Sequence, residues 1–263
     1  MVRAPACAGR FYPANPSDLS RMVRSFIAAA RVADEPAPKA LIAPHAGYLY
    51  SGPVAASAYA RFQPAHDLIK RVILVGPSHH AEFCGLAMSS ADAFMTPLGL
   101  VPLDKEALAQ IRSLPQVIVC DEAHGPEHCL EVQLPFLQSV LDEFTVVPLL
   151  AGDASDEEIV EALAALWNGP ETRIVVSSDL SHYQDYAAAR MVDQTTAQDI
   201  EALRTGPWDE NRACGFRPIR GLLHLARGRG LKPRCIDLRN SGDTAGPRDR
   251  VVGYGAFTFT ESH

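Results

Sequence analysis

Long hydrophobic runs are missing from this 263-residue sequence. A membrane-spanning helix needs about 18 or more consecutive apolar residues, and no stretch approaches that length. The opening residues include Pro5, Gly9 and Pro13, which interrupt the continuous apolar core that a signal peptide requires. We therefore expect a cytoplasmic protein that has no membrane partner.

A basic excess is missing as well. The sequence has 24 Lys and Arg against 31 Asp and Glu, a formal net charge of -7. Its only basic-leaning stretch, residues 217–239, is interrupted by apolar residues. Proteins that bind nucleic acid or anionic membranes usually present a basic face, so we expect no nucleic-acid partner.

Regular cysteine spacing and the common catalytic motifs are also absent. The six cysteines form no CxxC pair, and in a reducing compartment they should remain free thiols, one of which could serve as a ligand. The sequence has no GxGxxG after a strand, no Walker A motif, no GxSxG and no HExxH. Nucleotide binding and serine hydrolysis therefore lose their main sequence signals.

The clearest pattern that is present is a set of four short apolar runs, over residues 39–43, 71–75, 144–150 and 172–177. Runs without polar alternation are typical of strands covered on both faces, as in a largely parallel sheet. Helical patterns occur over 16–27, 52–62, 104–111, 127–141, 155–167, 186–203 and 219–227, and a last strand is expected over 250–260. Alternating strands and helices predict a single α/β domain over residues 1–263, with a mainly parallel central sheet flanked by helices.

Polar residues follow three of the four apolar runs. His45 follows the first run, His79 and His80 follow the second, and Asp179 and His182 follow the fourth. Ligands of open α/β sheets bind outside the carboxyl ends of the strands, so these side chains should converge. Imidazole and carboxylate groups suit Fe(II), Zn or Cu, although a single histidine is more often an ordinary surface residue or a hydrogen-bonded core residue.

His128 lies near the start of the predicted helix over 127–141, where Pro135 predicts a kink. Helical spacing would place His128 beside Glu127 or Glu131 on one face. A residue of the cavity wall and an exposed, capped helix start explain this pattern equally well. We expect His128 and His80 to contact substrate, and not to bind metal.

Five motifs in order resemble one family: APHAGYLYSG (43–52), GPSHH (76–80), EHCLEVQLPF (127–136), SSDLSHY (177–183) and CGFRPI (214–219). They resemble the Memo family, named for a mediator of ErbB2-driven cell motility, which includes bacterial proteins of the AmmeMemoRadiSam system. The resemblance covers nearly the whole chain. It implies a fold similar to the class III extradiol ring-cleaving dioxygenases and, as partners, other proteins of the AmmeMemoRadiSam system.

The resemblance also implies a metal site. His45, His79 and Cys214 match the metal-binding positions of the family, with a cysteine where the dioxygenases have a carboxylate. Cys214 follows from the resemblance alone, because its sequence surroundings are those of a small buried hydrophobe. Two imidazoles and one thiolate suit one non-haem metal ion, Fe(II) or Cu first and Zn as an alternative.

The remaining roles are catalysis and substrate binding. His182 matches the acid–base histidine of the dioxygenases, and Asp179 matches a pocket carboxylate of the Memo motif. Asp179 is also the nearest candidate in sequence for fixing the imidazole tautomers. Phe11 and Tyr50 match aromatic residues that form the wall of a peptide-binding cleft in Memo proteins.

Two classes of function remain open. The first is a metal-dependent redox enzyme, a dioxygenase-like oxidoreductase acting on a phenolic or peptide substrate, in which His182 moves a proton. The second is a non-catalytic module that binds a peptide or protein in the same cleft. Four metal-capable side chains favour the enzyme, because a peptide groove alone does not need them.

Overall fold

The computed structural model describes residues 1–30, 35–167 and 169–261, and a mixed sheet forms its centre. The order of the strands is β10 (His182–Gln184), β12 (Val251–Thr260), β2 (Ala40–Ala43), β9 (Thr172–Ser177), β3 (Arg71–Pro77), β8 (Thr145–Ala151), β4 (Leu86–Met88) and β7 (Val117–Val119), with β11 (Lys232–Asn240) also paired to β12. Strands β2, β9, β3 and β8 are parallel, and β12 runs antiparallel to each of its neighbours. Strand β4 is antiparallel to β8 but parallel to β7. The predicted α/β fold with a mainly parallel central sheet is confirmed.

The four apolar runs are the four central strands of this sheet. Leu41, Ile73, Val147 and Val175 are fully buried, one on each strand. Helices cover both faces of a parallel sheet, which explains why these strands lack polar residues. The predicted final strand is β12, but the sequence pattern does not predict β11, whose charged residues occupy an edge position with a single neighbour.

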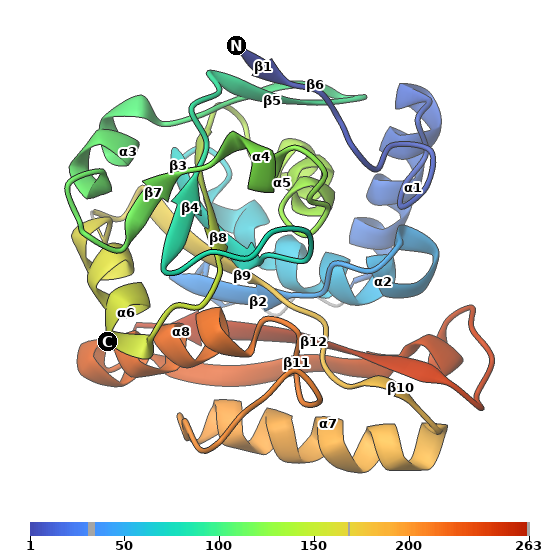
Figure 1. Cartoon of the computed structure of the whole chain (residues 1–263). Coiled ribbons are helices and arrows are strands. Elements are labelled where there is room, and N and C mark those ends of the chain that lie inside the picture. The colour runs from blue at the N-terminus through green and yellow to red at the C-terminus, as the bar shows by residue number, and fades with distance from the viewer. Residues whose placement is uncertain (31–34, 168, 262–263) are drawn as a thin grey trace.

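Helices cover the sheet on two sides (Figure 1). On one side lie α1 (Pro16–Ala29), α2 (Tyr48–Tyr59) and α5 (Leu134–Val140), and on the other lie α6 (Asp156–Ala165), α7 (Tyr186–Glu201) and α8 (Phe216–Arg229). Both α2 and α7 contact β11 and β12, while α8 contacts β3 and β9. Smaller elements complete the chain: β1 (Val2–Arg3), β5 (Ala93–Thr96), β6 (Gly99–Pro102), α3 (Lys105–Ile111), α4 (Asp121–His124), and the 3-10 helices η1 (Ala60–Ala65), η2 (Glu131–Gln133) and η3 (Ser241–Asp243).

The predicted helix over 127–141 is wrong at its start. Residues 127–130 are not helical, and the helical segment begins only at Glu131. The Glu127 carboxylate accepts the backbone N–H groups of His128 and Cys129, an alternative to helical hydrogen bonding of the kind that short-range side-chain acceptors offer. Pro135 occupies the first turn of α5 instead of kinking a longer helix, since its missing N–H costs nothing there.

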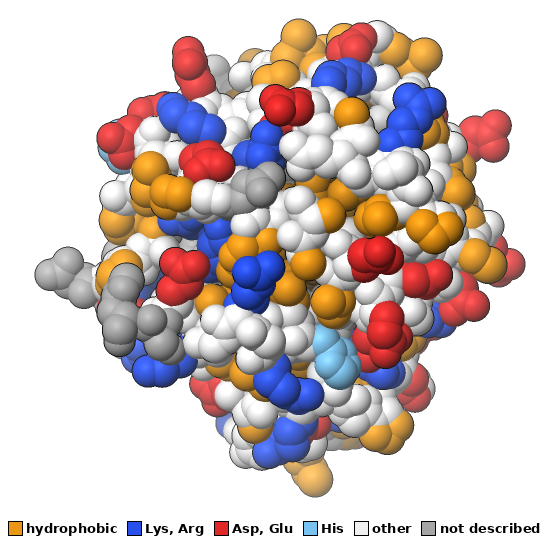
Figure 2. Space-filling view, turned by 90° about the vertical axis from the view of Figure 1, so that its left-hand side faces the viewer, with side chains coloured by type: hydrophobic (Ala, Val, Ile, Leu, Met, Phe, Trp, Pro, Cys, Tyr) orange, Lys and Arg blue, Asp and Glu red, His pale blue; other side chains and the backbone are white. Residues whose placement is uncertain are grey.

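The described residues contain no helix with both the length and the apolar character that a membrane crossing needs. Figure 2 shows one side of the molecule, where acidic and basic side chains are interspersed and hydrophobic side chains stand in small groups between them. Neither sign of charge dominates that side.

Candidate functional site

A cavity of about 1200 Å³ opens at the carboxyl end of the central strands. The expected site residues that line it are Phe11, His45, His79, His128, Asp179, His182 and Cys214. His45 comes two residues after β2 ends, His79 two residues after β3, and Asp179 two residues after β9. The topology therefore brings together side chains from distant parts of the sequence.

Two expected substrate-binding residues, Tyr50 and His80, are not among the residues that line the cavity. Helix α2 begins at Tyr48 and buries that ring, which turns the following residues outward and leaves Tyr50 39% exposed. His80 is exposed as well.

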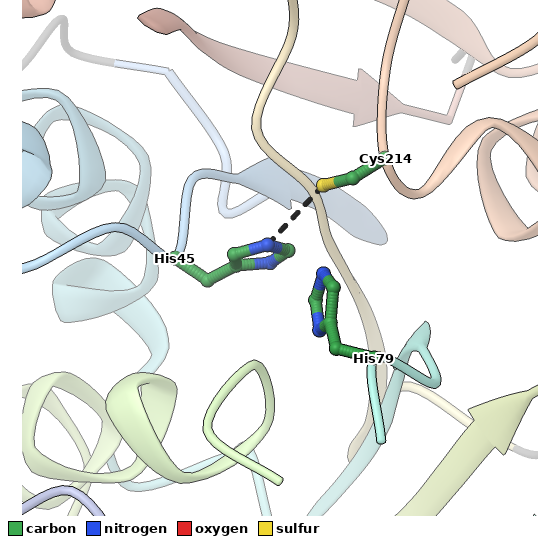
Figure 3. A group of neighbouring side chains, drawn as sticks. All are labelled: His45, His79 and Cys214. Atoms are coloured by element: carbon green, nitrogen blue, oxygen red, sulfur yellow. Dashed lines mark hydrogen bonds between the residues drawn. The ribbon is translucent and has the colours of Figure 1, made fainter. Parts of the chain in front are cut away.

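One group of potential metal ligands is formed by His45, His79 and Cys214. One ligand atom from each lies within 4.8 Å of the others. Nε2 of His45 is 3.2 Å from Sγ of Cys214, and the second ring nitrogen of His79 points toward the same space (Figure 3). The three side chains come from three loops, after β2, after β3 and before α8.

Ser177 orients the imidazole of His45. Its hydroxyl donates to the carbonyl of Cys129 at 2.7 Å and lies 3.0 Å from Nδ1 of His45. Because the hydroxyl proton is used, Oγ accepts from Nδ1–H, and Nε2 keeps its lone pair beside Cys214. Burial, reinforced by the neighbouring His79, lowers the pKa of His45 well below its usual 6.5. The ring is therefore neutral at physiological pH, the state that binds metal.

Glu127 orients the imidazole of His79. Nδ1 of His79 lies 2.9 Å from Oε1 of this buried carboxylate. An ionised carboxylate only accepts hydrogen bonds, so Nδ1 carries the proton and Nε2 is left for a ligand. Histidines that bind metals typically donate their other N–H to such a partner.

Cys214 reaches the site because the loop before α8 docks on the end of β9. The N–H of Gly215 donates to Oγ of Ser178 at 2.9 Å. A Cβ atom at Gly215 would lie 2.7 Å from Cβ of Ser178, so only glycine permits this approach. Burial, together with the negative charge of Asp179, raises the pKa of the Cys214 thiol, so a metal would have to displace its proton.

The expectation that Asp179 fixes an imidazole tautomer is wrong. Its Oδ1 accepts the backbone N–H groups of His45 and Ala46 at 2.7 and 3.3 Å. Asp179 thus holds the loop after β2, while Ser177 and Glu127 hold the rings. Burial raises the pKa of Asp179 despite the opposing effect of His182.

His182 is held by the backbone. Its Nδ1 lies 2.8 Å from the carbonyl oxygen of Leu180, which fixes the proton on Nδ1 and leaves Nε2 for a group in the cavity. The next residue, Tyr183, has a φ of 59°, a conformation that is uncommon for residues other than glycine. The backbone of β10 is therefore strained at the irregularity in its pairing with β12 that presents His182, as functional sites often are.

The donor set fits a single soft or borderline metal ion. His45 and His79 each have Nδ1 beside an acceptor, which leaves Nε2 as the ligand atom, and a sulfur lies beside them. Such sites suit Cu(I), Fe(II) or Zn. Sequence reasoning missed the residues that orient the rings, Glu127 and Ser177. The only sequence signals were that Glu127 precedes His128 and that Ser177 ends an apolar run.

The family model for Memo-like protein matches residues 3–258. The chain belongs to the Memo family. Memo-family relatives called "MEMO1 family protein" include one from Nitrosopumilus maritimus, 32% identical, with 98% of this chain and 100% of the relative covered. One from Archaeoglobus fulgidus is 32% identical, with 98% and 99% covered. One from Saccharolobus islandicus is 36% identical, with 98% and 99% covered. The match to the Memo model includes every candidate site residue named above.

Proposed function

We propose that this Memo-family protein binds one metal ion through His45, His79 and Cys214 and acts as a metal-dependent redox enzyme on a small phenolic or peptide substrate. The observation that carries the proposal is the pair of oriented imidazoles. Each donates Nδ1–H to a fixed acceptor and turns Nε2 toward the sulfur of Cys214. A purely structural pair of histidines would not need both lone pairs to face one thiol.

When bound, the metal would supply Lewis-acid polarisation or electron transfer to a coordinated group. The chain supplies the rest. His182 offers Nε2 to the cavity and can accept a proton from a phenolic hydroxyl group, which is general base catalysis. Asp179 keeps the His45 loop in place through two backbone N–H groups.

The cavity walls favour an aromatic ligand. Phe11, Phe83 and Phe216 line the cavity together with His128. Ring faces of this kind pack against planar groups. The volume of about 1200 Å³ is slightly above the usual range for a small-molecule site, about 300–1,000 Å³.

Metal analysis of protein purified without oxygen tests the proposal. The wild type should carry Fe, Cu or Zn near one equivalent, or take up Fe(II) or Cu(I) on reconstitution, and His79→Ala should not. His66→Ala is the matched control, because His66 is an exposed histidine that pairs with Asp142 outside the cavity.

The reconstituted protein should then be screened with catechols and Tyr-containing peptides. Turnover that disappears in His79→Ala supports the enzyme. Wild-type protein that binds no metal but binds such a peptide in the cavity would replace this proposal with the non-catalytic binding module.

A further inference from the structure

Glu127 is a buried carboxylate that contacts two histidines of the cavity. Its side chain is 1% exposed. Oε1 lies 2.9 Å from Nδ1 of His79 and 3.1 Å from Nδ1 of His128. The carboxylate also accepts the backbone N–H groups of His79, His128 and Cys129 at 2.7, 2.9 and 3.0 Å. One side chain thus ties the loop after β3 to the loop before η2.

This carboxylate determines which nitrogen of each ring carries the proton. Backbone N–H groups of three residues donate to its two oxygens, an arrangement that suits an ionised carboxylate. An ionised carboxylate has no proton to donate, so Nδ1 of both rings must be the donor. In the neutral form of each ring, which is the form that binds metal, Nε2 of His79 and Nε2 of His128 then keep their lone pairs.

The two rings also form one wall of the cavity. The ring centroids of His79 and His128 are 4.7 Å apart and their planes differ by 30°. Phe11 continues the wall, with its ring centroid 4.5 Å from that of His128. His79 and His128 contact the same carboxylate oxygen, so Glu127 constrains both rings.

The same contacts argue against Glu127 as a metal ligand. Glu127 has suitable neighbours for that role in His79 and Cys129 and, separately, in His80 and His128. However, a carboxylate offers about four lone-pair sites, and five N–H groups already surround this one. Ligation would leave buried N–H groups without an acceptor, which is costly.

We propose that Glu127 is the positioning residue of this site: it holds His79 with Nε2 toward Cys214 and holds His128 with Nε2 toward the cavity. The role rests on the proposed metal-binding function. Through its carboxylate, Glu127 links His79, a proposed metal ligand, to His128, a residue of the cavity wall.

The first experiment measures Cu(I) affinity under nitrogen by competition with a chromophoric chelator. Glu127→Gln keeps the shape of the side chain but turns an amide NH₂ group toward one of the N–H donors. Its affinity should fall by about 10–100-fold, the usual effect of losing such a partner. His128→Ala keeps the contact between His79 and Glu127, and its affinity should match that of the wild type.

Asp104→Asn is the control for a general loss of stability. Asp104 pairs with Arg71 at 2.6 Å, at the opposite end of β3 from His79. This variant should be less stable than the wild type and should bind Cu(I) equally well. Equal Cu(I) affinity of the wild type and a folded Glu127→Gln would overturn the proposal.

The second experiment needs neither metal nor a folded variant. Imidazole ¹⁵N NMR of the metal-free wild type, at about pH 8 and therefore above the usual histidine pKa, should show the Nδ1–H tautomer for both His79 and His128. An Nε2–H tautomer at either ring overturns the positioning role. Wild type that shows the expected tautomers but binds no Cu(I) supports the positioning role, while the metal-binding function fails.

Discussion

The hydroxyl oxygen of Ser177 lies 3.0 Å from Nδ1 of His45, and both residues are buried. The same oxygen accepts from Nε2 of Gln133 at 2.8 Å. A strand-end serine therefore fixes the tautomer of a ring whose other nitrogen faces Cys214. The hydroxyl of Ser177 can therefore be removed by mutation while every candidate metal ligand is kept.

Ser177→Ala should weaken Cu(I) binding by about tenfold or more, because His45 loses the acceptor that orients it. It should also lower the free energy of unfolding by about 1–3 kcal/mol, since buried N–H groups lose their partner. Metal titration and urea denaturation measure the two effects. Ser139→Ala, which removes a hydroxyl bonded to a carbonyl in α5, is the control. Unchanged Cu(I) affinity in Ser177→Ala would show that the ring is oriented by packing alone.

Cys214→Ser and His182→Ala should separate coordination from proton transfer. Cys214→Ser removes the only sulfur of the candidate ligand set, so binding of the soft ion Cu(I) should weaken more than binding of Zn. His182→Ala should leave metal affinity unchanged. It should slow turnover of the substrate found in the screen by about 10²–10⁴-fold. Metal content and steady-state kinetics provide the readouts. Equal metal loss in the two variants would instead identify His182 as a ligand.

Glu131→Gln should destabilise the protein strongly. Glu131 is buried and accepts hydrogen bonds from Arg3 at 2.7 Å, Tyr12 at 2.6 Å and Cys7 at 2.9 Å. Removing its charge leaves a buried guanidinium without its partner, a change that costs about 3–5 kcal/mol. Guanidinium denaturation measures this loss, with the exposed Glu143→Gln as control. A loss no larger than the control's would mean that water replaces the carboxylate.

Asp193 should make stability depend on pH. Burial raises the pKa of Asp193 to about 6 from 3.8, so the folded protein binds this proton more tightly than the unfolded chain does. The resulting stabilisation is complete below about pH 4 and is lost as the pH rises through about 6. A shift of about two pKa units corresponds to about 3 kcal/mol.

Asp193→Asn removes that dependence and can still accept the N–H of Ser181 through its side-chain oxygen. Urea denaturation at several pH values between 4 and 7 should show that the free energy of unfolding of the variant increases relative to that of the wild type as the pH rises. A difference between the two proteins that stays constant with pH would contradict the assignment.

Some residues of the candidate site can be predicted from the neighbouring sequence, and others cannot. His45, His79, Asp179 and His182 follow buried apolar runs, and strand topology makes such positions converge. Cys214 could be assigned only by resemblance to Memo sequences, because its approach depends on Gly215 docking against Ser178.

The sequence by itself determined the central strands, because buried parallel strands need uninterrupted apolar runs, and this local requirement is visible without any partner. Only the tertiary structure decided which groups orient the rings of His45 and His79, and at which residue each helix starts. In place of a helical turn, Glu127 accepts hydrogen bonds from the ring of His79 and the backbone N–H of His128. The start of α2 turns Tyr50 outward. Such outcomes depend on contacts between segments far apart in sequence, whose energies no local pattern records.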